Sequence, residues 1–95
     1  MIDYYDRDGK PITLMEWVAA SKDHDAKRVA FDKVGDVEVS TVWLGLDHQF
    51  GDGPPLIFET MVFGGTFDGE QARYTTEAQA RAGHKLMVAR VRGAK

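Results

Sequence analysis

Residues 37–46 read VEVSTVWLGL, and this stretch decides the fold. It is rich in β-branched and aromatic residues, which are typical of strands. Side chains alternate between the two faces of a strand, so the odd-numbered residues from Val37 to Trp43 share one face. The other face begins polar at Glu38 and becomes apolar towards its far end. We therefore predict a strand over residues 37–46 whose far end is covered on both sides.

Neighbouring stretches extend this strand into a sheet. Residues 56–63 (LIFETMVF) are almost continuously apolar, which predicts a central strand. Residues 28–34 predict a further strand, and Gly35-Asp36 turns the chain before residue 37. Strands joined by short turns pair antiparallel. Near the start of the chain, Asp8-Gly9 is a turn signal within residues 2–12, which predicts a small hairpin or an edge strand.

The segments between these strands predict one helix and two loops. Thr13 and Glu16 have the spacing of a capping box, which predicts a helix over residues 14–22. The charged residues 22–27 that follow predict a solvated loop. Residues 66–73 predict a second loop, because Asp68-Gly69 is another turn signal.

A second helix is predicted over residues 76–91, with Thr75 or Thr76 as its N-cap. The apolar side chains expected to face the sheet recur at helical spacing: Ala78, Ala82, Leu86 and Ala89, with Met87 and Val91 beside them. The order of elements predicts a single α+β domain over residues 1–95. In this domain an antiparallel sheet of three to four strands has two helices packed on one face.

The composition excludes several classes of function. The chain has 95 residues, a formal net charge of −3 and no cysteine, which rules out disulfides, zinc thiolate sites and cysteine nucleophiles. Its basic residues are scattered among acidic ones, so we do not expect nucleic acid as a partner. Its apolar runs are too short to span a membrane, and its first residues lack the pattern of a signal peptide. We therefore expect a cytoplasmic protein without a membrane partner.

Four blocks of the sequence together resemble a family of small phage and prophage proteins. The blocks are residues 39–48 (VSTVWLGLDH), residues 53–64 (GPPLIFETMVFG), residues 73–78 (RYTTEA) and Gly83-His84. The resemblance implies a cytoplasmic protein of phage or prophage origin, a class in which many members act on host machinery. It supplies no catalytic residue that could be carried over to this chain.

Four polar side chains are candidate binding residues: Asp47, His48, Glu59 and His84. Imidazole and carboxylate groups bind zinc, manganese or iron, so our alternative hypothesis is a small metal-binding domain or a metal-assisted enzyme that uses His48, Glu59 and His84. No tight ligand motif accompanies them, and we predict no cofactor. Glu59 interrupts an apolar strand, where a carboxylate is more often the partner of an arginine, a tyrosine or a backbone amide than a general base.

The apolar content is high for so small a sheet, which favours a protein partner. The large side chains concerned are Trp17, Trp43, Phe50, Phe58, Met61, Phe63 and Phe67. Trp43 and Phe58 belong to one predicted layer, Ile57 and Met61 to the other, and two short helices cannot cover both. An exposed apolar face marks an interaction surface, and twofold dimers are the commonest oligomers. Our leading hypothesis is a non-enzymatic protein-binding module that forms a homodimer, with Trp43 as a fifth candidate binding residue.

Overall fold

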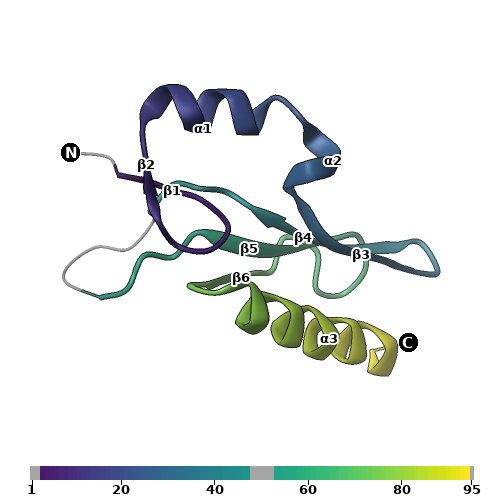
Figure 1. Cartoon of the computed structure of the whole chain (residues 1–95). Helices are drawn as coiled ribbons and strands as arrows, with labels where there is room; N and C mark the ends of the chain where they lie inside the picture. The colour runs from purple at the N-terminus through teal and green to yellow at the C-terminus, as the bar shows by residue number, and fades with distance from the viewer. Residues whose placement is uncertain (1–2, 48–52, 95) are drawn as a thin grey trace.

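The structure is a computed structural model that describes residues 3–47 and 53–94. It is an α+β fold with a four-stranded antiparallel sheet, a separate two-stranded hairpin and three helices (Figure 1). The elements, in chain order, are β1 (Tyr4–Tyr5), β2 (Pro11–Ile12), α1 (Leu14–Ser21), α2 (His24–Lys27), β3 (Arg28–Val34), β4 (Val37–Trp43), β5 (Phe58–Phe63), β6 (Gln71–Tyr74) and α3 (Glu77–Gly93). The predicted fold class is confirmed.

The large sheet has the strand order β3-β4-β5-β6, and every neighbouring pair is antiparallel. Gly35 has a φ of 61°, a left-handed conformation that suits glycine in the short turn between β3 and β4. Burial alternates along β4 and β5 as predicted. Val39 and Thr41 on β4 and Thr60 and Val62 on β5 are fully buried, whereas the side chains between them are partly accessible.

Helix α3 covers the buried face of the sheet and contacts all four strands. Thr76 is its N-cap, and a reciprocal capping box joins Thr76 to Gln79. The side chains that α3 buries are Ala80, His84, Met87, Val88 and Val91. The four apolar ones pack into two hydrophobic clusters, one around Val39 and Val62 and the other around Trp43 and Phe58.

The inward stripe predicted for this helix is confirmed for Met87 and Val91, which are buried, but was wrong for its other four residues. Leu86, which was expected to face the sheet, is 69% exposed, and Ala78, Ala82 and Ala89 are exposed as well. The polar residue His84 faces inward instead, because it finds hydrogen-bond partners on the sheet. Gly83 also lets the helix approach closely, since a Cβ at this position would lie 2.2 Å from the Tyr74 hydroxyl oxygen.

Two irregularities change which side chains reach the core. The register of β3 against β4 slips between Arg28 and Ala30, so Val29 is an extra residue and is buried with Trp43. At the far end of β4, Leu44 and Gly45 both donate backbone hydrogen bonds to the carbonyl of Ile57. Ile57 is therefore fully buried in the Trp43 cluster instead of sharing a face with Met61, as its position in the sequence predicted.

The N-terminal segment, residues 3–27, forms the hairpin and the two shorter helices. The predicted turn at Asp8-Gly9 and the Thr13–Glu16 capping box are both confirmed. The prediction of a loop before β3 was wrong, because Asp23 caps the short helix α2 by accepting the backbone N–H groups of the first turn. Helix α1 reaches the sheet through Trp17, whose indole nitrogen donates to the Leu44 carbonyl at 2.9 Å.

The strand boundaries differ from the predicted ones in three places. Strand β4 ends at Trp43 rather than at residue 46, because Gly45 adopts a positive φ of 74°. Strand β5 begins at Phe58 rather than at residue 56. Residues 71–74, which were predicted to end a loop, form the edge strand β6.

Candidate interaction surface

The sheet face opposite α3 is not covered by any helix in the described part of the chain. The strand register places its side chains in three rows that run across the strands. We call this surface the open face. Its residues are Arg28, Val42, Glu59 and Arg73 in the first row, Phe31, Ser40, Met61 and Gln71 in the second, and Lys33, Glu38 and Phe63 in the third.

Large apolar side chains of the open face lie on three of the four strands, β3, β4 and β5. Phe31 on β3 is 39% exposed and Phe63 on β5 is 47% exposed. Val42 on β4 and Met61 on β5 are half-buried between them. The Arg28 guanidinium lies 4.6 Å from the centre of the Phe31 ring, a distance at which cation–π attraction is effective. The predicted surplus of apolar sheet surface is therefore present, but it is interrupted by charged groups.

The charged groups of the open face are arranged as opposite-sign neighbours. The Arg73 side chain donates to a Glu59 carboxylate oxygen at 3.0 Å across β5 and β6. Lys33 and Glu38 are directly opposite each other across β3 and β4. Cross-strand pairs of opposite charge favour this register. Glu59 is thus explained as an arginine partner on the accessible side of a strand, which is the commoner of the two roles considered for it.

His84 belongs to a buried chain of polar side chains on the opposite face. One ring nitrogen, Nδ1, lies 2.7 Å from the Thr41 hydroxyl, and the other, Nε2, lies 2.7 Å from an Asp32 carboxylate oxygen. The Thr41 hydroxyl is also hydrogen-bonded to Thr60. His84 is only 3% exposed, and both threonines are completely buried.

The order carboxylate, imidazole, hydroxyl is one that nucleophilic enzymes use. A nucleophile must contact its substrate, however, and solvent reaches neither the Thr41 hydroxyl nor the Thr60 hydroxyl. The role of this chain of polar side chains is therefore structural. It provides hydrogen-bond partners for polar side chains of three strands and α3 inside an otherwise apolar layer. No sequence pattern indicated the Thr41–Thr60 pair, because the pair depends on the register between two strands that are joined by a loop.

The structure does not bring the predicted metal ligands together. Glu59 lies on the open face, and His84 lies beneath α3 on the other side of the sheet. His48 lies outside the described residues. Within residues 3–47 and 53–94, no three histidine, aspartate or glutamate side chains are grouped so that they could hold an ion.

The two remaining candidate residues lie near the hairpin. Asp47 accepts a hydrogen bond from the backbone N–H of Leu56 at 3.2 Å and so joins the two ends of the loop between β4 and β5. Trp43 is 3% exposed, and its indole nitrogen donates to the Tyr5 carbonyl at 3.1 Å. Of the four candidate binding residues that lie within the described ranges, Glu59 alone is on the open face.

No family model, curated protein or solved structure matches the chain. No helix within the described ranges combines the length and the hydropathy needed to cross a bilayer.

Proposed function

We propose that this protein is a non-enzymatic binding module and that its open face binds a second copy of the same chain. The observation that carries the proposal is a four-stranded sheet of which the described residues cover one face with a helix, while Phe31 and Phe63 are accessible on the other. Burying such side chains between two copies would remove apolar surface from water, which is the main driving force of most protein association.

The charges of the open face support a second copy as the occupant. A twofold interface sets a surface against itself, so a surface of one sign repels its own copy. The open face carries both signs: three cations (Arg28, Lys33 and Arg73) and two anions (Glu38 and Glu59), a formal charge of +1. The whole chain has a charge of −3, so the rest of it carries −4. Two copies therefore repel each other less through the open face than through the remaining surface.

The resemblance to small phage and prophage proteins extends this proposal. A dimer of this kind would be an accessory protein in the cytoplasm of the host cell that binds and modulates a host protein. The buried position of the His84 chain supports binding rather than catalysis, because its imidazole and hydroxyl groups cannot contact a substrate while the domain is folded.

The test is the mass of the protein in solution, measured by light scattering from micromolar to millimolar concentration. We expect twice the chain mass of 10.6 kDa for the wild type. The double variant Phe31→Thr/Phe63→Thr should have the mass of a monomer, since threonine keeps the β propensity but removes the aromatic surface.

The control removes two apolar side chains from the helices that are more exposed than Phe31 and Phe63. The variant Met15→Lys/Leu86→Lys loses two exposed hydrophobic residues that lie outside the sheet, and it should remain dimeric. A wild-type protein that stays monomeric at every concentration would overturn the proposal. So would a threonine variant that is folded, as judged by circular dichroism, and still dimeric.

A further inference from the structure

A hollow lies on the covered side of the sheet, between the N-terminal segment and Trp43. Its volume is about 430 Å³, within the range of small-molecule sites. Its apolar walls are Ile12 on β2, Ala19 and Ala20 on α1 and Ala26 on α2, and Trp43 lines its base. The short alanine side chains are what leave the space open, because they fill little of the volume between α1, α2 and the sheet. We call this hollow the hairpin pocket.

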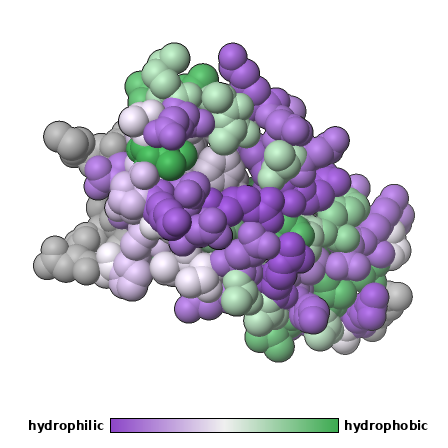
Figure 2. Space-filling view, in the orientation of Figure 1, coloured by the Kyte–Doolittle hydropathy of each residue, from purple (hydrophilic) through white to green (hydrophobic). Residues whose placement is uncertain are grey.

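The rim of the hairpin pocket is formed by charged residues of the hairpin loop and of the start of α2. They are Asp6, Arg7, Asp8 and Asp23. In the space-filling view, hydrophilic residues gather across the middle of the molecule, between hydrophobic residues at the top and at the bottom (Figure 2). The pocket therefore combines an apolar interior with a polar mouth.

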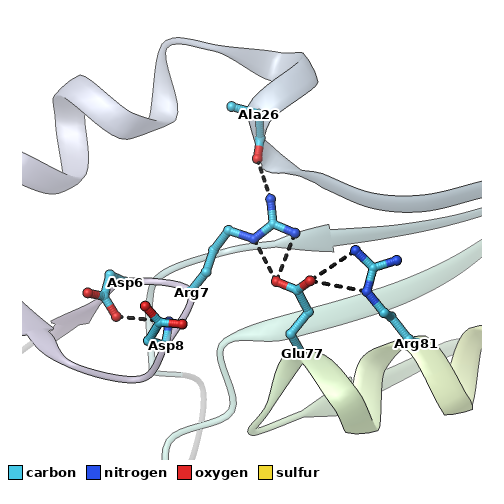
Figure 3. A network of polar contacts seen from close by, with 6 residues as sticks. All are labelled: Asp6, Arg7, Asp8, Ala26, Glu77 and Arg81. Carbon is cyan, nitrogen blue, oxygen red and sulfur yellow. Dashed lines mark hydrogen bonds and ion pairs between the residues drawn. The ribbon is translucent and has the colours of Figure 1, made fainter.

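The Arg7 guanidinium, which also lines the pocket, is already paired with a carboxylate of α3 and with a backbone carbonyl of α2. It donates to a Glu77 carboxylate oxygen at 2.8 Å and to the Ala26 carbonyl at 2.9 Å, so it joins the hairpin to α2 and α3 (Figure 3). Glu77 is also bound by Arg81. The hydrogen bond from Arg7 lowers the pKa of the Glu77 carboxyl, and the one from Arg81 lowers it further by a smaller amount. Partial burial acts in the opposite direction but does not cancel this effect, so the carboxylate stays charged and paired.

The three aspartates, by contrast, keep acceptor capacity. Asp6 uses one oxygen, Oδ1, to accept the backbone N–H groups of Asp8 and Lys10. Asp23 likewise uses Oδ1 to cap α2. Among the described residues, no hydrogen bond occupies the second oxygen of either carboxylate or either oxygen of Asp8. In the part of the chain that the structure describes, none of these three aspartates forms an ion pair, so the mouth carries three carboxylates beside Arg7, whose own ion pair is with Glu77.

We propose that the hairpin pocket binds a small organic cation, an ammonium group attached to an apolar body of a few carbons. The apolar body would lie between the alanines of α1 and the Trp43 ring. The ammonium group would remain at the mouth, where the free oxygens of Asp6, Asp8 and Asp23 accept its N–H groups. The pocket and the open face are on opposite sides of the sheet, so this proposal does not depend on dimerisation.

The test is a titration with 2-phenylethylamine, followed through the indole N–H signal of Trp43 in ¹⁵N-correlated NMR spectra. We expect saturable shifts at Trp43 and at the amides of Ala19 and Ala20. The neutral 2-phenylethanol should bind roughly tenfold more weakly, because it lacks the charge that the three exposed carboxylates attract. The anion 3-phenylpropionate should not bind, because the same carboxylates repel it.

Two variants identify the binding residues. Asp6→Asn/Asp8→Asn/Asp23→Asn keeps the turn and cap acceptors but removes the charge, and it should lose about tenfold in affinity for the amine while its affinity for the alcohol stays the same. Ala20→Leu should fill the pocket and abolish binding of both. The controls are Asp36→Asn/Asp68→Asn and Ala82→Leu, which make the same changes outside the pocket and should leave binding unchanged.

Three results would overturn the assignment. These are no shift at Trp43 with any probe, equal affinities for the amine and the alcohol, and unchanged amine binding by the asparagine variant. Tighter binding of N-acetyl-lysine amide than of 2-phenylethylamine would also overturn it, because the pocket would then belong to a lysine side chain of a partner protein.

Discussion

The two ends of the chain are attached to the sheet by different means. Helix α3 buries five side chains, and the strands beneath it contain residues that are completely inaccessible to water. The N-terminal segment, residues 3–27, has no buried residue at all. It is attached by a few polar contacts and by partly buried aromatic side chains: Trp17 to Leu44, Trp43 to Tyr5, and Arg7 to Glu77. One end is held by hydrophobic burial and the other by specific contacts.

This difference predicts two levels of stability within one small domain. Regions with few buried apolar contacts open locally, at a lower free energy than the whole fold. The hairpin pocket lies at the boundary between the two levels, with one wall from the N-terminal segment and its base from the sheet. A ligand that binds there would stabilise the N-terminal segment against local opening, because it would contact both this segment and the sheet.

The largest expected effect comes from comparing two aromatic residues that pack in the same cluster. Phe58 is fully buried and Trp17 is partly exposed. Phe58→Ala should lower the free energy of global unfolding by about 3–5 kcal/mol, because it leaves a cavity in the core. Trp17→Ala should lower the global value by less than half of that, while it speeds hydrogen exchange across residues 3–27. Urea denaturation and native-state hydrogen exchange measure the two quantities.

A Trp17→Ala variant that is destabilised as much as Phe58→Ala would contradict the prediction of two levels of stability. The N-terminal segment would then unfold only together with the sheet. The same conclusion would follow if the amides of residues 3–27 exchanged in the wild type as slowly as those of β4 and β5.

A second, smaller effect concerns the polar chain beneath α3. Thr41→Val removes the hydroxyl that joins His84 to Thr60 and leaves both without this partner in a buried layer. The expected cost is about 1–3 kcal/mol of unfolding free energy. The control is Ser40→Val on the open face of the same strand, where the cost should be within about 0.5 kcal/mol.

The double variant Thr41→Val/Thr60→Val sharpens this test. It should cost less than the two single variants together, because it also removes the hydroxyl that a single substitution leaves unpaired. Strictly additive costs would mean that the two hydroxyls do not act as a pair.

The strands and caps were predictable because they depend on local patterns. Alternation along residues 37–43 identified the buried face, and the Thr13–Glu16 capping box identified the start of α1. Strand β6 was missed because the sequence QARY has little β propensity of its own, and its conformation comes from pairing with β5. The bulge at Val29 was missed for the same reason, since it exists only relative to β4.

The functional residues were harder to predict, because their partners are distant in the sequence. His84 was recognised as a candidate, but its inward position depends on Thr41, 43 residues away. Arg7 was not singled out, since its partner Glu77 is 70 residues away. The hairpin pocket depends on where three alanines are placed in space, and alanine carries no chemical signal in a sequence. Such sites follow from tertiary packing, which periodicity and spacing do not encode.

The smallest expected effect is the pH dependence of the Arg7–Glu77 contact, which joins the two regions. Because the pKa of Glu77 is lower in the folded protein than in the unfolded chain, its contribution to stability is present above the unfolded pKa. That contribution is lost as the pH falls through the folded pKa. Both side chains are about one-third exposed, so solvent screens the pair, and we expect only about 0.5–1 kcal/mol at neutral pH. Glu77→Gln should therefore be less stable than the wild type at pH 7.

The difference between Glu77→Gln and the wild type should shrink towards zero as the pH falls through the lowered pKa of the folded protein, because the wild-type carboxyl then becomes neutral as well. Urea denaturation at pH 7, 5, 4 and 3 measures it, and Asp36→Asn, which removes an exposed carboxylate from the turn between β3 and β4, serves as the control. A difference that stayed constant over this range would show that Glu77 acts through packing or helix capping. In that case the charge pair would not hold the N-terminal segment to α3, and the contact between the two regions would depend on the aromatic residues and backbone hydrogen bonds around Trp43.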